Sequence, residues 1–315
     1  MNTENKISNF TEEIVKVENL SKSYEKGKVK ALKDISFSIN KGELFGFIGP
    51  DGTGKTTLFR ILTTLLLADT GTASLNNLDV VKDYKKLRKI LGYMPGRFSL
   101  YQDLSIEENL NFFATVFGTT IEENYDLIKD IYIQIEPFKK RLAGKLSGGM
   151  KQKLALSCAL IHKPTILILD EPTTGVDAVS RKEFWEMLKR LKEKGITILV
   201  STPYMDEASM CDRIALMQSG KILSIDTPVN TIKSFEEELY SVSSRDIYRL
   251  KNDLKEYENT SSVFLFGQNL HYTSKQENTN IDELKDYLIG NNHEEIKIEK
   301  IEPNIEDCFM RLMEN

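Results

Sequence analysis

The chain has 315 residues, of which 40% are apolar and 28% are charged, and its formal net charge is −5. This composition predicts a folded protein with a buried core and excludes an intrinsically disordered chain. The acidic balance argues against a nucleic-acid partner, because such partners favour a basic face, and the length suits one large and one small domain.

The N-terminal segment, residues 1–12, is polar and mixed in charge, so we expect a flexible tail. It has no apolar stretch typical of a signal peptide, and no later run approaches the ~20 apolar residues that span a bilayer. We therefore expect a soluble, cytoplasmic protein. Cys158, Cys211 and Cys308 are too far apart for a zinc site and are expected to be inert reduced thiols.

Residues 13–230 read as the large domain. Two strand-like runs, 14–20 and 32–39, are followed by a turn at Lys41-Gly42 and by the apolar run ELFGFI at 43–48. A glycine-rich loop comes next, and TTLFRILTTLLLA predicts a helix that begins near Thr56.

The glycine-rich loop fits the phosphate-binding pattern GxxxxGK[ST] between a strand and a helix. Its glycines let backbone N–H groups surround phosphates, and the helix N-terminus adds a favourable dipole. Lys55 is expected to reach the β- and γ-phosphates, and Thr56 to bind Mg²⁺. The predicted ATP contacts in this loop are Gly49, Pro50, Asp51, Gly52, Thr53, Gly54, Lys55, Thr56 and Thr57.

Residues 96–163 read as mostly helical, with apolar spacing through Ile106, Leu110 and Phe113. Near its end, LSGGMKQK (146–153) places Ser147 at an N-cap and opens a helix with two glycines. By itself this motif predicts an ordinary capped helix. Its position about 20 residues before LILDEP favours an anion site that serves a second nucleotide across a dimer interface.

LILDEP (167–172) ends a buried strand with two carboxylates. Asp170 is costly to bury unless it meets a cation, so we expect it to hold Mg²⁺ through a water molecule. Glu171, one residue later, is the predicted general base that polarises the attacking water. Lys55 is the second predicted catalytic residue.

A helix at 178–194 and a strand at 196–200 continue in βαβ order, and the polar stretch 226–238 is expected to end the large domain. Residues 236–315 then read as strand, helix, two strands, helix, strand and a final helix. That order is ferredoxin-like. We expect this small α+β domain to serve dimerisation or regulation.

The loop, LSGGMKQK, LILDEP and TTGVD (173–177), in this order, make residues 12–235 resemble the nucleotide-binding subunit of ABC transporters. The resemblance implies an α/β, P-loop NTPase fold with an N-terminal antiparallel β subdomain and a helical subdomain at 96–163. It implies ATP and Mg²⁺ as cofactors and a head-to-tail pair of such domains. Each ATP then lies between one phosphate loop and the partner's signature motif.

Carried over residue by residue, the resemblance implies that Ser147, Gly148 and Gly149 contact the partner's γ-phosphate. Asp177 is then expected in the loop that touches the opposite site, and Tyr24 to stack on adenine. The final segment is similar to the small domain of some bacterial exporter ATPases, which favours export over import. We expect integral membrane transporter subunits as partners, a position on the inner face of the cell membrane, and no nucleic acid.

Three positions depart from the family pattern. Where the family usually has a histidine that hydrogen-bonds the γ-phosphate, STPYMDEA has Pro203, whose side chain offers neither donor nor acceptor. Where the family usually has a glutamine near Mg²⁺, this chain has Gly96, and Gln102 substitutes only if its loop folds back. Asp51, where asparagine is commoner, adds a carboxylate that repels phosphate.

These departures predict that the chain binds MgATP but hydrolyses it slowly in its own site. Two pairings stay open: a heterodimer with a more active ATPase subunit, and a homodimer in which Glu171 suffices. Two other function classes also stay open, a soluble ATP-dependent sensor and a nucleic-acid-linked ABC-type ATPase. Phe112, Phe113 and Phe117 are expected to fill the core, with a groove for a membrane subunit's helix as the alternative.

Overall fold

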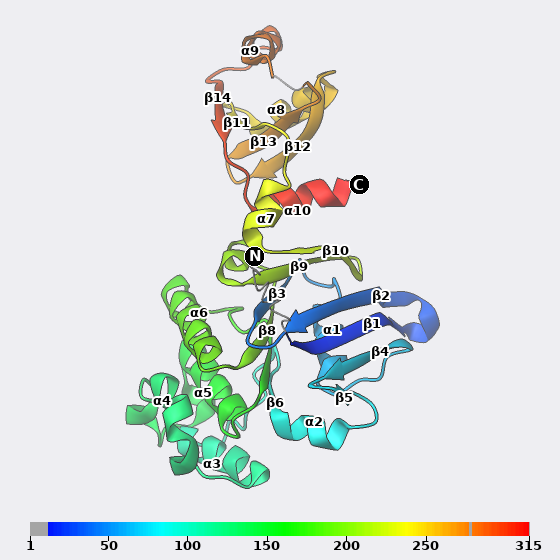
Figure 1. The fold of residues 1–315 in the computed structure, drawn as a ribbon. Coiled ribbons are helices and arrows are strands. Elements are labelled where there is room, and N and C mark those ends of the chain that lie inside the picture. Colours follow the sequence, from blue (N-terminus) through cyan, green and yellow to red (C-terminus); the bar gives the residue numbers. More distant parts are fainter. Residues whose placement is uncertain (1–11, 277–278, 315) are drawn as a thin grey trace, which may run out of the picture. The chain divides into compact units, whose positions relative to one another are not determined.

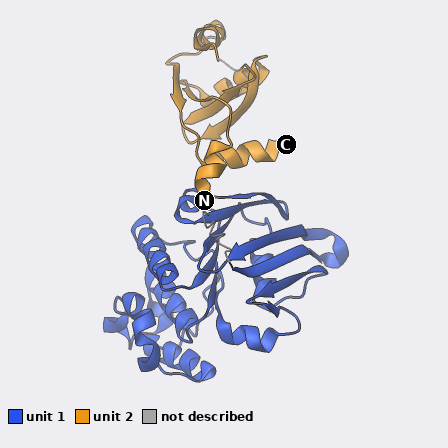
Figure 2. Ribbon diagram, viewed as in Figure 1, with its two compact units in different colours: residues 1–226 blue, residues 227–315 orange. Residues whose placement is uncertain are grey.

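The computed structural model describes residues 12–276 and 279–314, so the predicted tail lies, except for residue 12, outside the described residues. The chain divides into two compact units, residues 1–226 and residues 227–315 (Figure 2). The sequence places this division slightly later, between residues 230 and 236. Each unit has its own cluster of buried apolar side chains.

The first unit contains an antiparallel sheet with strand order β2-β1-β4-β5 (Figure 1). The long β1–β2 pairing has several register shifts, which let it curve. Along this sheet, apolar residues on one face alternate with polar residues on the other, as expected for a half-exposed sheet. The strands are β1 (Glu13–Tyr24), β2 (Val29–Asn40), β4 (Thr70–Leu75) and β5 (Leu78–Asp79).

The second sheet of this unit positions the candidate site. Its strand order is β10-β9-β3-β8-β7-β6, and all neighbours except β10 and β9 pair in parallel. Strands β3, β7 and β8 are buried along their whole length, which explains their continuous apolar runs. The strands are β3 (Leu44–Ile48), β6 (Leu91–Met94), β7 (Ile166–Asp170), β8 (Thr197–Thr202), β9 (Arg213–Gln218) and β10 (Lys221–Asp226).

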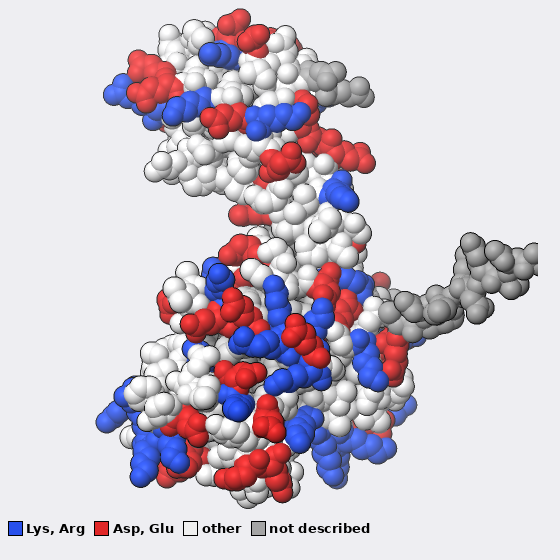
Figure 3. All heavy atoms as spheres, turned by 60° about the vertical axis from the view of Figure 1, so that its left-hand side comes forward, with Lys and Arg blue, Asp and Glu red and all other residues white. Residues whose placement is uncertain are grey.

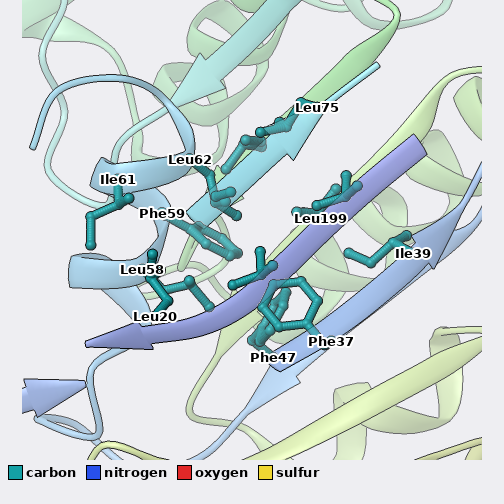
Figure 4. Packing of buried hydrophobic residues seen from close by; sticks show 14 of the residues in the cluster. Leu20, Phe37, Ile39, Phe47, Leu58, Phe59, Ile61, Leu62, Leu75 and Leu199 are labelled. Carbon is teal, nitrogen blue, oxygen red and sulfur yellow. The ribbon is translucent and has the colours of Figure 1, made fainter. Parts of the chain in front are cut away.

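Helix α1 (Lys55–Leu62) packs between the two sheets (Figure 4). Phe59 is fully buried, and its ring meets Phe47 of β3 edge to face at 5.5 Å between centroids. Phe37 of β2 meets the same Phe47 ring at 5.1 Å. Aromatic pairs of this kind add about 0.5–1.5 kcal/mol to the gain from apolar burial, so this cluster fixes the start of α1 against the parallel sheet.

Three of the remaining α-helices of the first unit lie within the predicted helical stretch at 96–163, and the helices at 84–90 and 178–193 lie before and after it. Helix α3 begins with a capping box between Ser105 and Glu108 and ends at Gly118, whose φ is +70°. The α-helices are α2 (Tyr84–Ile90), α3 (Ile106–Phe117), α4 (Tyr125–Tyr132), α5 (Gly148–Leu160) and α6 (Ala178–Glu193). Short 3₁₀ helices are η1 (Glu25–Gly27), η2 (Glu122–Asn124), η3 (Glu136–Phe138), η4 (Ala143–Lys145) and η5 (Met205–Met210).

The second unit contains an antiparallel sheet with strand order β12-β13-β11-β14, the ferredoxin-like order. Helices α8 and α9 bury Leu250, Leu254, Leu284 and Leu288 in its core. The strands are β11 (Leu239–Ser243), β12 (Thr260–Phe266), β13 (Asn269–Ser274) and β14 (Lys297–Ile301). The helices are α7 (Pro228–Lys233), α8 (Ile247–Glu256), α9 (Ile281–Gly290) and α10 (Ile305–Glu314).

Helix α7 lies in the polar stretch 226–238, where the sequence predicts no helix. Thr227 caps it by accepting a hydrogen bond from the Asn230 N–H, and Pro228 occupies its first position. Thr231 is buried, and its carbonyl accepts a hydrogen bond from the thiol of Cys308 on α10. This six-residue segment therefore forms a helix because the contact with Cys308 compensates for the weak helical pattern of its apolar residues.

Within the described residues, every helix is too short or too polar to cross a bilayer.

Candidate functional site

The phosphate loop joins β3 to α1, as the sequence predicts. At two of its positions only glycine fits without a steric clash. A Cβ on Gly49 would lie 2.3 Å from the carbonyl oxygen of Met217. Gly54 has a φ of +104°, and a Cβ there would lie 2.3 Å from the carbonyl oxygen of Ala31. Neighbouring backbone therefore presses on the loop from two strands and fixes its path.

The Lys55 ammonium lies under this loop and is almost completely buried, at 3% exposure. It donates hydrogen bonds to the carbonyl oxygens of Gly49 at 2.6 Å and Pro50 at 2.9 Å. It also lies 3.5 Å from Oε1 of Glu171. Burial lowers the pKa of Lys55, while the charges of Glu171, Asp51 and Asp170 oppose that shift.

Asp170 ends β7 and lies beside the first turn of α1. Its Oδ1 accepts hydrogen bonds from the hydroxyl of Ser201 at 2.7 Å and from the hydroxyl of Thr56 at 3.2 Å. A threonine hydroxyl and an aspartate carboxylate are the hard oxygen donors that Mg²⁺ prefers, together with phosphate oxygens and water. These residues therefore fit the predicted magnesium site, in which Thr56 and Asp170 would hold the ion.

Glu171 follows with an unusual backbone conformation, a φ of +49°. Side chains other than glycine rarely adopt this region, and such strain concentrates at active sites. The strain is held because the Glu171 N–H donates to both the hydroxyl and the carbonyl oxygen of Ser201, at 3.0 and 3.1 Å. The side chain stays 23% exposed, so its carboxylate can reach a water molecule beside the phosphate loop.

Tyr24 ends β1 on the other side of the loop. Its hydroxyl lies 3.3 Å from the Thr57 hydroxyl, and 36% of the residue is exposed. The Tyr24 ring therefore lies next to the predicted nucleotide contacts, and part of its surface is exposed.

The signature segment begins α5. The Ser147 hydroxyl accepts a hydrogen bond from the Met150 N–H at 3.4 Å. A Cβ on Gly149 would touch the Ser180 hydroxyl at 3.0 Å, so this glycine lets α5 approach α6. Asp177 caps α6 by accepting hydrogen bonds from Val179 and Ser180, and these bonds lower its pKa. No hydrogen bond among the described residues joins Ser147, Gly148 or Gly149 to the phosphate loop of the same chain.

Pro203 comes directly after β8, at the carboxyl end of the parallel sheet. The preceding Thr202 hydroxyl donates to Glu207 at 2.5 Å and accepts from the Tyr204 N–H at 3.0 Å. Glu207 is buried and also accepts from the Thr173 hydroxyl at 3.1 Å. It therefore ties the turn at Pro203 to the loop that carries Glu171.

Sequence reasoning missed Glu207. The only available signal was its place in the STPYMDEA stretch, where the family pattern also has an acidic residue.

Gly96 lies beside Asp170, the carboxylate predicted to hold Mg²⁺. A Cβ on Gly96 would lie 3.1 Å from the carbonyl oxygen of Asp170 and 3.8 Å from its Oδ2. Gln102 does not replace the missing side chain. Its side-chain Oε1 lies beside Gly144, 3.6 Å from where a Cβ on that residue would stand, and Gln102 does not line the groove described next.

A groove of about 1070 Å³ begins at Thr56, Asp170 and Glu171 and continues past Gly96 to helix α3. Phe113 and Phe117 line it, and Phe112 is 39% exposed. The expectation that these three rings fill the core is therefore wrong for Phe112, while Phe113 and Phe117 are partly buried and line the groove. That a membrane subunit's helix binds there stays a prediction.

Comparisons with known proteins agree with this geometry. Residues 32–174 match the family model described as "ABC transporter". A probable multidrug ABC transporter ATP-binding protein, YbhF of Escherichia coli K12, is 35% identical over 304 residues, which cover 95% of this chain and 52% of YbhF. The chain thus spans about half the length of that relative.

A second relative, the linearmycin resistance ATP-binding protein LnrL of Bacillus subtilis 168, is 36% identical over 217 residues, 68% of this chain and 69% of LnrL. Among solved structures, the dimeric post-hydrolysis state of the ATP-binding cassette MJ0796 bound to ADP and Pi is similar with a TM-score of 0.61. It is 26% identical and covers 68% of this chain and 98% of its own.

Proposed function

Because the chain belongs to the ATP-binding proteins of ABC transporters, we propose that it binds MgATP and powers export by a membrane partner. The observation that carries this proposal is the convergence of Lys55, Thr56, Asp170 and Glu171 at one end of the parallel sheet. The names of the relatives, a multidrug and a linearmycin resistance protein, favour export over import. We place the chain on the inner face of the cell membrane, bound to integral membrane subunits.

In this proposal, the phosphate loop and Lys55 hold the triphosphate, and Tyr24 stacks on the adenine. Thr56 and Asp170 hold Mg²⁺, which when bound neutralises charge on the phosphates. Glu171 accepts a proton from the attacking water as general base. Ser147, Gly148, Gly149 and Asp177 act on the nucleotide of a second ATPase subunit, and among the described residues they make no hydrogen bond to the phosphate loop of their own chain.

Hydrolysis in the chain's own site is proposed to be slow. The Pro203 side chain supplies no hydrogen bond to the γ-phosphate, and Gly96 supplies no side-chain amide beside Asp170. Losing one positioned hydrogen-bonding group typically costs on the order of 10²–10⁴ in rate. Pairing with a more active subunit makes use of the intact signature segment, while a homodimer relies on Glu171 alone.

Steady-state ATP turnover of purified variants tests this proposal. Pro203→His and Gly96→Gln are expected to raise turnover at least ten-fold when combined, while Pro203→Ala and Gly96→Ala, which add no polar group, are not. Glu171→Gln should abolish turnover and Lys55→Ala should abolish nucleotide binding. High turnover in the unmodified chain, unchanged by the first two substitutions, would contradict the slow site. Nucleotide binding that survives Lys55→Ala would overturn the whole function.

A soluble ATP sensor is the second candidate, and the pair Pro203 and Gly96 favours it. A nucleic-acid-linked ATPase has less support. On the face drawn in Figure 3, lysines and arginines of the first unit are interspersed with acidic side chains rather than joined in one basic stripe. Affinity purification from solubilised membranes distinguishes these classes, because only the transport subunit is expected to co-purify with an integral membrane protein.

A further inference from the structure

The densest run of positive charge in the sequence lies at helix α2. Five of the eight residues 82–89 are lysine or arginine, and no other stretch of eight residues in the chain has as many. All five side chains are exposed: Lys82, Lys85, Lys86, Arg88 and Lys89. This charge is therefore presented to solvent.

The lysines of this run share one face of the helix. Lys85, Lys86 and Lys89 lie on the same side of α2, and Lys82, in the turn before it, precedes the first two by three and four residues. Leu87 points the other way, since it is fully buried. The described residues that line the groove at Asp170 do not include these lysines. The lysine face is therefore a surface distinct from the groove.

Two large apolar side chains are exposed beside the lysines. Val81 is 54% exposed and Tyr84 is 39% exposed. The Tyr84 ring centroid lies 5.9 Å from Nζ of Lys85 and 5.3 Å from Cζ of Arg88. Arg88 also donates a hydrogen bond to the Thr64 hydroxyl at 2.8 Å, which ties α2 to the end of α1. Cations and apolar groups are thus fixed side by side.

Nearby carboxylates offset only part of this charge. Asp83 pairs with Lys86 at 3.2 Å. Asp79 accepts hydrogen bonds from the N–H groups of Lys82 at 2.8 Å and Val81 at 2.9 Å, and these bonds lower its pKa. Both carboxylates lie within residues 79–89, where five cations outnumber them. The surface at α2 is therefore locally positive.

The net charge of −5 comes from the other end of the chain. Residues 227–315 contain 18 acidic and 10 basic side chains, whereas residues 1–226 contain 29 acidic and 32 basic ones. At physiological ionic strength, charges more than about 8 Å apart are largely screened. A surface that approaches α2 therefore meets the local positive charge rather than the acidic average of the chain.

We propose that this surface, here called the α2 patch, binds the headgroups of an anionic lipid bilayer. The patch consists of the four lysines and the two apolar side chains beside them: Lys82, Lys85, Lys86, Lys89, Val81 and Tyr84. The inference rests on the proposed function in placing the chain at a membrane. It goes beyond that function because it adds a direct contact with lipid to the contact with membrane subunits.

The composition of the patch suits a bilayer surface. Lysine stems lie along an apolar boundary while their ammonium groups reach the phosphates, and an amphipathic tyrosine ring sits at the same depth. Each lysine or arginine close to an anionic bilayer strengthens binding about five-fold. A bilayer is favoured over nucleic acid because Val81 gains from a headgroup–acyl boundary and gains little from a sugar–phosphate backbone.

Co-sedimentation of the full chain with lipid vesicles tests the proposal. Vesicles of phosphatidylcholine with about 30% phosphatidylglycerol are expected to bind the chain at least ten-fold better than vesicles of phosphatidylcholine alone. Added salt should weaken the preference, since it screens the attraction. Equal binding to the two kinds of vesicle would overturn the proposal.

Substitutions in the patch separate local charge from total charge. Lys85→Gln combined with Lys89→Gln should lower binding to the anionic vesicles at least ten-fold, whereas Lys85→Arg combined with Lys89→Arg should preserve it. The matched control is Lys189→Gln combined with Arg190→Gln. These two exposed cations lie on α6, away from α2 (Figure 1), and their replacement changes the total charge equally.

Three outcomes contradict the proposal. They are anionic-vesicle binding that survives the glutamine pair at positions 85 and 89, an equal loss in the α6 control, and a loss in the arginine pair. A double-stranded 20-mer oligonucleotide is tested in parallel. If the oligonucleotide binds more tightly than the vesicles and loses its affinity in the same glutamine pair, the patch belongs to nucleic acid and the lipid proposal fails.

Binding of a fluorescent ATP analogue is measured on the same samples. If the analogue binds and the preference for anionic vesicles is absent, only the lipid inference fails. If the analogue does not bind, the proposed function fails whatever the vesicles do.

Discussion

At the scale of single residues, Asp170 and Glu171 are neighbours in sequence but face different surroundings. Asp170 is held by two hydroxyl groups and is buried, whereas Glu171 is forced into a left-handed conformation and stays partly open to water. In the proposed function these surroundings give adjacent carboxylates separate tasks, Asp170 beside a metal ion and Glu171 beside the attacking water. The sequence predicts both tasks because a strand ends at this pair.

The cysteine thiols give a test at this scale. Burial raises the pKa of Cys158 and Cys211 strongly, and raises the pKa of Cys308 to about 11. We expect all three thiols to react slowly with Ellman's reagent at pH 8 in the native protein and rapidly in denaturant, since the thiolate is the nucleophile. Rapid native reaction of any thiol would show that its surroundings are open.

The direction of the pH effect follows from the same shift. The folded pKa of Cys308 lies above its unfolded value, so this thiol stabilises the fold fully below about pH 9. That contribution is lost as the pH rises through about 11. The free energy of unfolding should therefore fall over this alkaline range, and Cys308→Ala should reduce the fall.

At the scale of secondary-structure elements, the strength of local signals explains what the sequence could and could not predict. The phosphate loop, β7 and the start of α5 are each defined by neighbouring residues, and all three lie where expected. The groove could be offered only as an alternative to the core, because it exists only where α3, β6 and α5 come together. Helix α7 was missed for the same reason, since its contact with Cys308 is 77 residues away in the chain.

Helix α1 gives a test at this scale. Phe59→Ala removes a fully buried ring from the contact with Phe47 and should lower the free energy of unfolding by about 3–5 kcal/mol. Phe112→Ala is the matched control, because that ring is 39% exposed and should cost much less. Urea denaturation measures both. Equal losses would mean that the aromatic cluster does not fix α1 against the sheet.

At the scale of the whole molecule, the two units have separate apolar cores, one built around Phe47 and Phe59 and one around Tyr272 and Leu254. The chain has a single tryptophan, Trp185, which is buried in α6 of the first unit. Tryptophan fluorescence therefore reports unfolding of the first unit alone, while circular dichroism reports both.

We predict that these two signals respond to different changes. MgATP at about 100 times its dissociation constant should stabilise the first unit by about 2.7 kcal/mol and shift the tryptophan transition. Leu254→Ala should destabilise the second unit by about 2–5 kcal/mol and leave the tryptophan transition in place. A tryptophan transition that moves with Leu254→Ala would mean that the two cores unfold together.

The contact between Lys55 and Glu171 has a consequence for the order of events in catalysis. One ammonium faces both the carbonyl oxygens of its loop and the carboxylate of the base. A triphosphate carries more negative charge than that carboxylate and competes for the same cation. In the proposed function, binding of the triphosphate would thus release the Glu171 carboxylate from Lys55, so the general base would become available only once ATP is bound.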